Sequence, residues 1–312
     1  MREFSIIKHR WIFLIFSAIL VFASIFSLTV WGLKLGVEFK GGSLMAVKFD
    51  DKVPAREELI SVLSSEDLGD ITVQPSDNKT LILKFKSVDE DTHQEVLKKI
   101  KDLAPGEESQ FTSIGPVVGK ELEQKSALAI ALAVICIMLY IAWAFRRVSK
   151  PISSWQYGLI VAIVALLHDV IIPLGLFAAL GYFMNIEINV AFVAAILTIL
   201  GFSVHDTIVV FDRTRENLRK IFDKSFGEIV NTSLNQTLGR SLATSITVLL
   251  TIGAIGLWGG SAIADFALVL FVGIAVGTYS SIFVAGPLLI ELQRVKVFMG
   301  GLRNKRRNRR YR

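Results

Sequence analysis

The apolar residues of this chain fall into six long runs, and most of the charged residues lie between these runs. A helix needs about 20 apolar residues to cross a hydrocarbon core about 30 Å thick. The first run extends from Trp11 to Leu33, and its length exceeds that of a signal-peptide core, so we expect an uncleaved anchor. The pattern predicts five further transmembrane helices, at residues 126–145, 156–180, 188–211, 238–259 and 264–290.

The stretch between the first two runs has the pattern of a folded α+β domain. Alternating apolar residues predict strands at 43–50, 70–75, 80–86 and 109–115, and apolar residues at helical spacing predict helices at 54–65 and 89–104. The order βαββαβ is that of a ferredoxin-like split unit. We therefore expect a membrane all-α bundle of six helices, with one exported ferredoxin-like domain at residues 34–125 between helices 1 and 2.

The distribution of charge predicts the orientation in the membrane. The chain is 52% hydrophobic and 20% charged, and residues 34–125 hold 13 Lys and Arg against 18 Asp and Glu, while the rest of the chain holds 21 against 10. Basic residues precede the first span, follow the second and the fourth, and fill the tail at 291–312. By the positive-inside rule these segments and both termini are cytosolic, so residues 34–125 are exported.

Catalytic and metal-binding motifs are missing from the sequence. Cys136 is the only cysteine, so the chain can form neither an internal disulfide nor a cysteine-based metal site. The sequence contains no nucleotide-binding loop, zinc helix motif or nucleophile elbow. We therefore predict a protein that is not an enzyme and that has no cofactor or metal. For the basic tail we favour an anchor on anionic membrane lipid and expect no nucleic acid partner.

Charged residues inside the predicted spans are the candidate functional residues, because a charge at the centre of a span costs about 2.5 to 3.5 kcal/mol on insertion scales. Asp206 lies in the cytosolic half of the fourth span. The fifth span carries a polar stripe at spacings of three and four, which must face protein or water. Since these two spans run in opposite directions, we expect Asp206 and Arg240 to meet at similar depth as a proton relay. The stripe consists of Thr237, Arg240, Thr244, Thr247 and Thr251.

Each of these residues also has a purely structural interpretation. Asp206 and Arg240 could form a static ion pair that only fixes helix packing. Asp169 lies near the middle of the third span, where Pro173 cannot donate to the carbonyl of residue 169, so it is either a second relay residue or a capped acid at a kink. The neighbouring His168 and His205 are expected to pack or hydrogen-bond rather than carry protons.

Several glycine and proline residues are expected to have backbone roles. Gly41 and Gly42 would allow a tight exit from the first span, and Gly115 and Pro116 would form a hinge at the return into the membrane. In the sixth span, the small residues of GIAVG predict close helix packing at Gly273 and Gly277.

Six segments together resemble the SecD/SecF family of protein-export membrane proteins, and within it the SecF proteins, over nearly the whole chain. Any one of them is a weak signal, but their order within a six-span frame is specific. The segments are GVEFKGGS at 36–43, SIGPVVGKEL at 113–122, LHDVIIPLG at 167–175, GFSVHDTIVVFDRTREN at 201–217, NQTLGRSLATS at 235–245 and GTYSSIFVAGPLL at 277–289.

The resemblance implies a function in the bacterial inner membrane. Such proteins pair with SecD in a bundle similar to that of RND-type exporters and assist SecYEG, with SecA and also YajC as a candidate partner, in releasing unfolded preprotein by means of the proton motive force. The family's coupling acid falls on Asp206 and its basic partner on Arg240, while Asp169 lies in a matching motif. The coupling ion is H⁺, with Na⁺ as the other possibility. The alternatives are an RND-type exporter half for a lipid or small molecule and a structural assembly factor.

Overall fold

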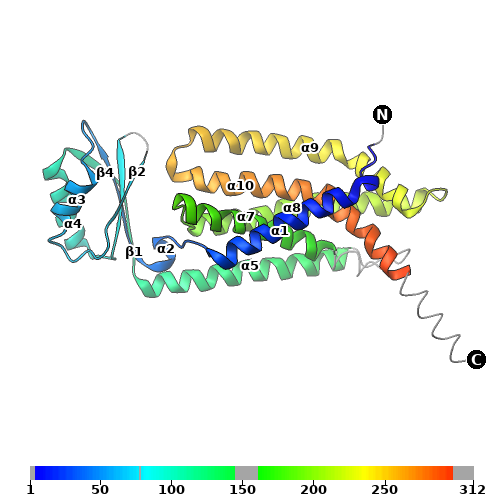
Figure 1. Cartoon of the computed structure of the whole chain (residues 1–312), viewed down its shortest axis with the longest axis horizontal. Coiled ribbons are helices and arrows are strands. Elements are labelled where there is room, and N and C mark those ends of the chain that lie inside the picture. Colours follow the sequence, from blue (N-terminus) through cyan, green and yellow to red (C-terminus); the bar gives the residue numbers. More distant parts are fainter. Residues whose placement is uncertain (1–3, 77–78, 145–160, 298–312) are drawn as a thin grey trace, which may run out of the picture.

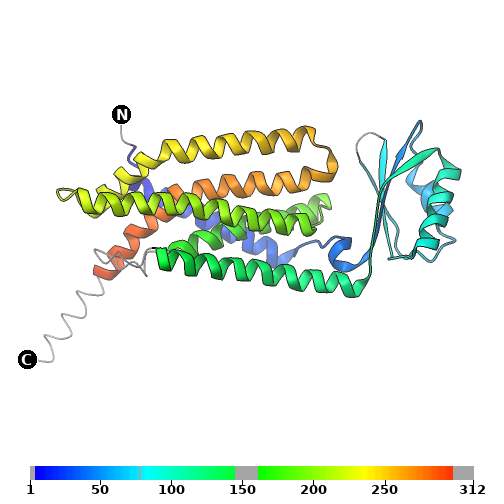
Figure 2. The same cartoon turned by 180° about the vertical axis from the view of Figure 1, so that it is seen from behind.

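The chain folds into a long helical bundle with a small sheet domain at one end (Figure 1). The computed structural model describes residues 4–76, 79–144 and 161–297. The end of the second predicted span at residue 145, the start of the third at 156–160 and the tail from residue 298 lie outside these residues. Figure 2 gives the view from behind, where α5, α8 and α9 are in front.

Six of the described helices are long and apolar enough to cross a membrane, as the hydropathy pattern predicts. The sixth continues beyond α10 through the π-helical turn η3 (Ser281–Ala285) to Val297. The bounds are α1 (Arg10–Val30), α5 (Pro116–Ala144), α7 (Ala162–Met184), α8 (Val190–Lys220), α9 (Phe226–Trp258) and α10 (Ser261–Ser280).

Two helices begin well before the apolar run that reveals them. α5 begins at Pro116 and α9 at Phe226, ten and twelve residues before the predicted spans. Pro116 fits the first turn of a helix, where its missing N–H is not needed. At α9, Ser225 and Glu228 form a capping box, each side chain bonded to the other residue's backbone N–H. Hydropathy therefore locates the part of a helix that lies in lipid, while proline and caps determine where the helix begins.

The sheet domain follows α1 and precedes α5. Its elements in chain order are α2 (Val37–Lys40), β1 (Gly42–Phe49), α3 (Arg56–Leu63), β2 (Thr72–Pro75), β3 (Thr80–Phe85), α4 (Glu90–Leu103) and β4 (Gly106–Ile114). The strand order is β2-β3-β1-β4 and all three pairings are antiparallel. α3 and α4 cover one face (Figure 1), and the core between them and the sheet is separate from that of the bundle.

A polar cap determines where α4 begins. The carboxylate of Asp89 accepts a hydrogen bond from the backbone N–H of Thr92 at 3.1 Å. Hydrogen bonds from the side chain and the backbone of Thr92 lower the pKa of Asp89 below its ordinary value. This sheet domain thus has its own helix cap and its own apolar core.

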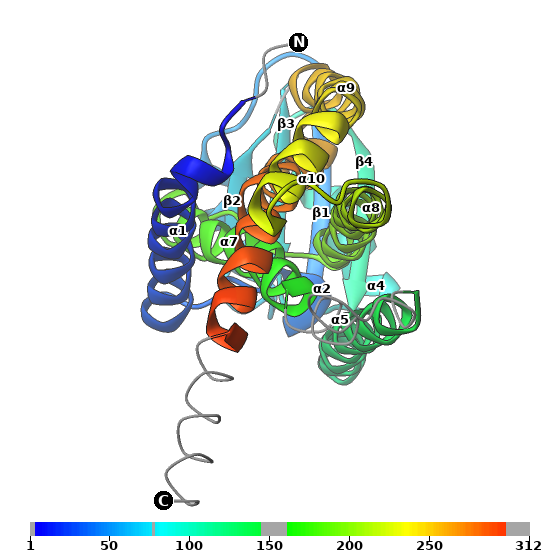
Figure 3. The ribbon, with the colours of Figure 1, turned by 90° about the vertical axis from the view of Figure 1, so that its right-hand side faces the viewer.

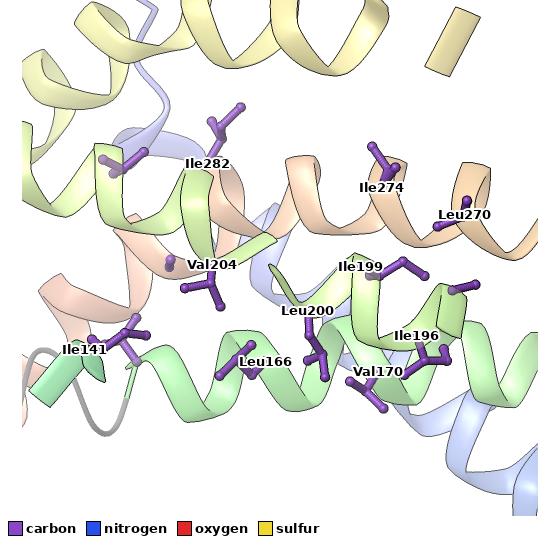
Figure 4. Packing of buried hydrophobic residues seen from close by; sticks show 14 of the residues in the cluster. Ile141, Leu166, Val170, Ile196, Ile199, Leu200, Val204, Leu270, Ile274 and Ile282 are labelled. Atoms are coloured by element: carbon purple, nitrogen blue, oxygen red, sulfur yellow. The ribbon is translucent and has the colours of Figure 1, made fainter. Parts of the chain in front are cut away.

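The core of the bundle lies around α7, α8 and α10. About half or more of the apolar window of each of these spans is buried, against less than a fifth for α1, α5 and α9. In Figure 4, apolar side chains of α8 such as Ile196 and Leu200 pack between Leu166 and Val170 of α7 and Ile274 of α10. Figure 3 looks along the bundle and shows α1, α5 and α9 at its periphery. The buried polar groups of α7, α8 and α10, such as Asp169 and Ser280, are therefore shielded from lipid.

The chain leaves α1 and returns into α5 at one crowded point. Gly41 and Gly42 have φ values of +81° and +140°, which residues with a side chain rarely adopt. A Cβ at Gly41 would also lie 2.7 Å from Cα of Pro116. Gly115 has no positive φ, and a Cβ there would meet no atom within 4 Å. The backbone therefore requires glycine at 41 and 42, whereas at Gly115 neither φ nor crowding requires one.

Candidate functional site

Asp169 is the most deeply buried acid in the bundle, with no exposed surface. Its Oδ2 accepts hydrogen bonds from the hydroxyls of Ser203 on α8 and Ser280 on α10, the latter at 2.8 Å. Nδ1 of His168 lies 2.9 Å from its Oδ1, while Nε2 of His168 has no partner among the described residues. The carboxyl group thus joins three helices, and the predicted interpretation of His168 as a hydrogen-bonding residue agrees with this geometry.

Pro173 lies inside α7, one turn beyond Asp169, as the sequence predicts. Proline cannot donate to the carbonyl of residue 169, so the backbone there keeps a free acceptor. The helix nevertheless continues on both sides of Pro173. The carboxyl group therefore lies where α7 is weakened, surrounded by hydroxyl groups of neighbouring helices.

Asp206 is the second buried acid, one turn along α8 from Ser203. Its residue is 4% exposed, and its Oδ2 has no hydrogen-bond partner among the described residues. Ser241 on α9 faces its carboxyl group, whereas the neighbouring His205 is exposed. The hydroxyl of Ser241 is itself buried without a partner in the described part of the chain. An unsatisfied carboxyl oxygen in a membrane is costly, so Asp206 is a candidate functional residue.

Arg240 lies on α9 next to Ser241 but does not form the predicted ion pair with Asp206 in this conformation. No ion pair between the two is present within the described ranges. Arg240 is exposed and lines a polar cavity of about 670 Å³ between α5, α8 and α9, at the end of the bundle that is far from the sheet. In this conformation Arg240 therefore lines the cavity and is not paired with Asp206.

The cavity connects Arg240 to the charged ends of α8 and α9. Arg213 donates to Oε1 of Gln236 at 2.6 Å and to Oε2 of Glu216 at 2.6 Å. The apolar side chains of Ile208 and Val209, just beyond Asp206, line the same cavity. Water in this cavity would therefore reach within about one turn of Asp206.

The polar stripe of α9 has two parts. Thr237 is buried, whereas Arg240, Thr244, Thr247 and Thr251 are exposed. The buried polar face of α9 is instead formed by serines, among them Ser245, which accepts a hydrogen bond from Thr278 of α10 at 2.7 Å. Within this single chain, the part of the stripe from Arg240 to Thr251 thus faces outward from the bundle, where lipid would be an unfavourable environment for the charge of Arg240.

The two predicted packing glycines lie at the crossing of α8 and α10. A Cβ at Gly273 would lie 2.1 Å from Cδ1 of Ile199, and a Cβ at Gly277 would lie 2.9 Å from Cβ of Ser203. This close approach brings Ser280 and Ser203 to the same carboxyl oxygen of Asp169. The small residues are therefore needed for the site as well as for packing.

Sequence reasoning missed Gly175. A Cβ there would lie 2.3 Å from Cβ of Ser24 on α1, and the hydroxyl of Ser27 donates to the carbonyl of Gly175 at 2.7 Å. The available signal was the set of small residues that recur on α1 at Ser17, Ser24 and Ser27, all buried on an otherwise exposed helix. Within the described residues, no three His, Cys, Asp or Glu side chains gather as they would around a metal ion.

Two family comparisons match this chain. The family described as protein export membrane protein SecD/SecF, C-terminal, matches residues 93–295, and the SecD/SecF GG motif matches residues 26–53. The chain belongs to the SecD/SecF family.

Relatives in this family are similar to this chain over most of their own length. The protein translocase subunit SecF of Thermobaculum terrenum is 41% identical over 92% of this chain and 93% of its own length. That of Anaerolinea thermophila is 35% identical, again over 92% of this chain and 93% of its own. This chain is thus similar to the SecF subunits, which are named as translocase subunits, and with its six apolar helices it is a multi-pass membrane protein.

Solved structures of SecDF have a similar fold. The crystal structure of SecDF from Thermus thermophilus, a translocon-associated membrane protein, has a TM-score of 0.81 at 29% identity and covers 94% of this chain. A structure of SecDF in a super-membrane-facing form has a TM-score of 0.67. This SecD/SecF chain spans about two fifths of the length of those SecDF chains, 39% and 40%.

The family matches include the candidate site. Gly41 and Gly42 fall within the GG motif, and Asp169, Asp206 and Arg240 fall within the C-terminal region. The SecD/SecF family thus extends over both the entry into the sheet domain and the buried acids.

Proposed function

We propose that this chain acts with a SecD partner to promote late steps of preprotein translocation and release, driven by the proton motive force. The observation that carries the proposal is the buried carboxyl group of Asp206, whose Oδ2 is unsatisfied beside a helix with an outward-facing arginine. A group that changes its charge inside a membrane needs such an environment, whereas a packing residue would be paired.

Pairing with SecD is supported by the outer face of α9. Arg240, Thr244, Thr247 and Thr251 are exposed in this chain, and although the threonine hydroxyls donate to carbonyls of their own helix, the charge of Arg240 is costly in lipid. A second bundle against α8 and α9 would cover them. This chain spans about two fifths of the length of the SecDF chains, which leaves room in those chains for a second bundle. SecYEG, with SecA and also YajC, and the unfolded preprotein are proposed partners on the strength of the family resemblance.

The proposed stroke depends on the distance between Asp206 and Arg240. When Asp206 is ionised, its charge attracts the guanidinium of Arg240 from the polar cavity toward the carboxylate. When Asp206 takes up a proton, this attraction ends and Arg240 returns to the cavity, the arrangement described above. Asp169 would take part through Ser203, which lies one turn from Asp206 on α8. We propose H⁺ as the coupling ion. Na⁺ is the alternative, and imposing a proton gradient or a sodium gradient separately distinguishes the two.

We further propose that residues 34–125 form an extracytoplasmic ferredoxin-like domain and that both termini are cytoplasmic, in the bacterial inner membrane. The strand order β2-β3-β1-β4 and the element order within this domain support the first point. Arg213, Arg215 and Arg219, at the end of α8 far from the sheet domain, support the second by the positive-inside rule.

The partner surface predicts a specific cross-link. A photoreactive benzoylphenylalanine at Thr247 is expected to form a covalent adduct with SecD in membranes, because this position would lie in the interface between the bundles. The matched control is the same substitution at Phe22, which is 77% exposed on the apolar face of α1. Adduct formation is measured by gel shift. Equal yields from both positions, or none from Thr247, would contradict the partner assignment.

The export function is tested in inverted membrane vesicles that contain SecYEG, SecA and SecD. We expect the imposition of a proton gradient to accelerate preprotein translocation when this chain is present and to have a much smaller effect when it is omitted. Collapse of the gradient with a protonophore should remove the difference. If the gradient acts equally with and without the chain, the proposed function is wrong, and efflux of a lipid or small molecule would then be the activity to measure.

A further inference from the structure

The segments that join the sheet domain to the bundle are in contact through a short parallel backbone pairing. Leu35, just after α1, bridges to Ile188, just before α8. The N–H of Gly36 donates to the carbonyl of Ile188 at 2.9 Å, and the N–H of Ile188 donates to the carbonyl of Lys34 at 2.8 Å. A Cβ at Gly36 would lie 3.1 Å from that carbonyl oxygen of Ile188, so the approach is close. The path into the sheet domain is thus attached to the start of α8.

A second connection binds directly to the first turn of α8. The carboxylate of Glu38, in α2, accepts a hydrogen bond from the N–H of Val190 at 2.7 Å. Val190 is the first residue of α8, whose N–H has no partner within the helix. The negative charge of Glu38 also interacts favourably with the positive end of the helix dipole. A residue that belongs to the entry of the sheet domain therefore caps the helix that carries Asp206.

A third connection comes from the sheet itself. Nζ of Lys84, on β3, lies 2.8 Å from Oε2 of Glu187, in the loop between α7 and α8. Both side chains are mostly buried, with 16% and 18% of their surface exposed. Lys84 is also within electrostatic range of Asp265 near the start of α10. Such a partly shielded pair is screened less by salt than a surface pair and restrains the sheet relative to the bundle.

From these three connections we infer that residues 34–38 and 186–190, together with Lys84, form a joint that transmits displacement of α8 to the sheet domain. α8 is one continuous helix from Val190 past Asp206 to Lys220, so a shift at Asp206 moves its outer end as well. Because Glu38 and the paired backbone are attached to that end, the sheet domain follows. This inference rests on the proposed function for the origin of the displacement, but the attachment itself is independent of it.

The attachment is tested by a distance measurement on the full chain with SecD in lipid. Cys136, the one cysteine of the sequence, is replaced by serine, and spin labels are placed through Asp102→Cys on α4 and Met184→Cys on α7, both exposed positions. In Lys84→Gln we expect the distribution of label distances to widen about twofold, because domains with small interfaces move relative to each other by default. Lys84→Arg keeps the charge and should keep the narrow distribution.

The matched control is Lys86→Gln, which removes an exposed pair with Asp67 at 2.7 Å within the sheet domain and should leave the distribution narrow. The same variants are compared in gradient-driven translocation, where Lys84→Gln should lose most of the acceleration and Lys84→Arg and Lys86→Gln should keep it. If the distribution of label distances in Lys84→Gln is as narrow as in the unmodified chain, the proposed joint is wrong. If the distribution of label distances widens in Lys84→Gln but the proton gradient accelerates translocation in none of the variants, the joint is supported and the proposed function is contradicted.

Discussion

Asp206→Asn is expected to reduce gradient-driven translocation to the rate seen without a gradient. Asparagine fills nearly the same space but cannot exchange a proton or attract Arg240, so the charge that drives the proposed stroke never changes. The measurement is preprotein translocation in vesicles with SecD, with and without an imposed proton gradient. Translocation that depends only on ATP hydrolysis by SecA should be unchanged, which separates a coupling defect from a folding defect.

Two further substitutions sharpen this test. Asp212→Asn removes an acid on the same helix whose side chain is 68% exposed and 3.9 Å from Arg215, and it should retain the full gradient response. Asp206→Glu keeps a titratable carboxyl group and should recover part of the response. Were Asp206→Asn as active as Asp212→Asn under a gradient, the carboxyl group would have no part in coupling.

Gly175→Ala is expected to destabilise the chain by at least about 2 kcal/mol, the middle of the range for overpacked cores. The added Cβ would lie 2.4 Å from Cα and 2.7 Å from the carbonyl oxygen of Ser24, so the backbone of α1 has to move away from α7. That movement also stretches the hydrogen bond from Ser27 to the carbonyl of Gly175. The effect is measured as a lower midpoint of thermal unfolding in detergent.

The control for this substitution is Gly201→Ala. Gly201 lies inside α8, and a Cβ there would meet no atom within 4 Å. Alanine favours a helix by up to about 1 kcal/mol over glycine, so this variant should unfold at the same temperature or higher. Equal unfolding midpoints for the two variants would show that α1 does not pack against Gly175 as described.

The number of spans could be predicted from the sequence because burial in lipid demands long apolar runs. The two acids were recognisable for the same reason, since a carboxyl group such as Asp169 conspicuously interrupts such a run. The direction in which a side chain points was harder to predict. Arg240 and Ser241 are adjacent, and a rotation of about 100° per residue decides which of them meets Asp206. The stripe of threonines indicated a polar face but not that most of it is exposed on the outside of the bundle.

The residues at which individual helices begin were also only partly predictable from the sequence. A window of hydropathy cannot detect the polar first turns of α5 and α9, whose beginnings depend on Pro116 and on the capping box of Ser225 and Glu228. Contacts between distant segments, such as that between Leu35 and Ile188, leave no periodic signal in either segment. Gly175 was missed because one glycine in an apolar run has no pattern until the opposing serines are placed beside it.

The π-helical turn after α10 has a consequence for how the last span is compared with other sequences. A π-helical turn contains one residue more than an α-helical turn. The residues after Ala285 are therefore rotated about the helix axis relative to the positions that a continuous α-helix from α10 would give them. A helical wheel drawn through the whole span would misplace Leu289, which is fully buried, by about 100° around the helix. Alignments that insert or delete one residue near Ser281 would therefore rotate the faces assigned to residues 286–297 by about 100°.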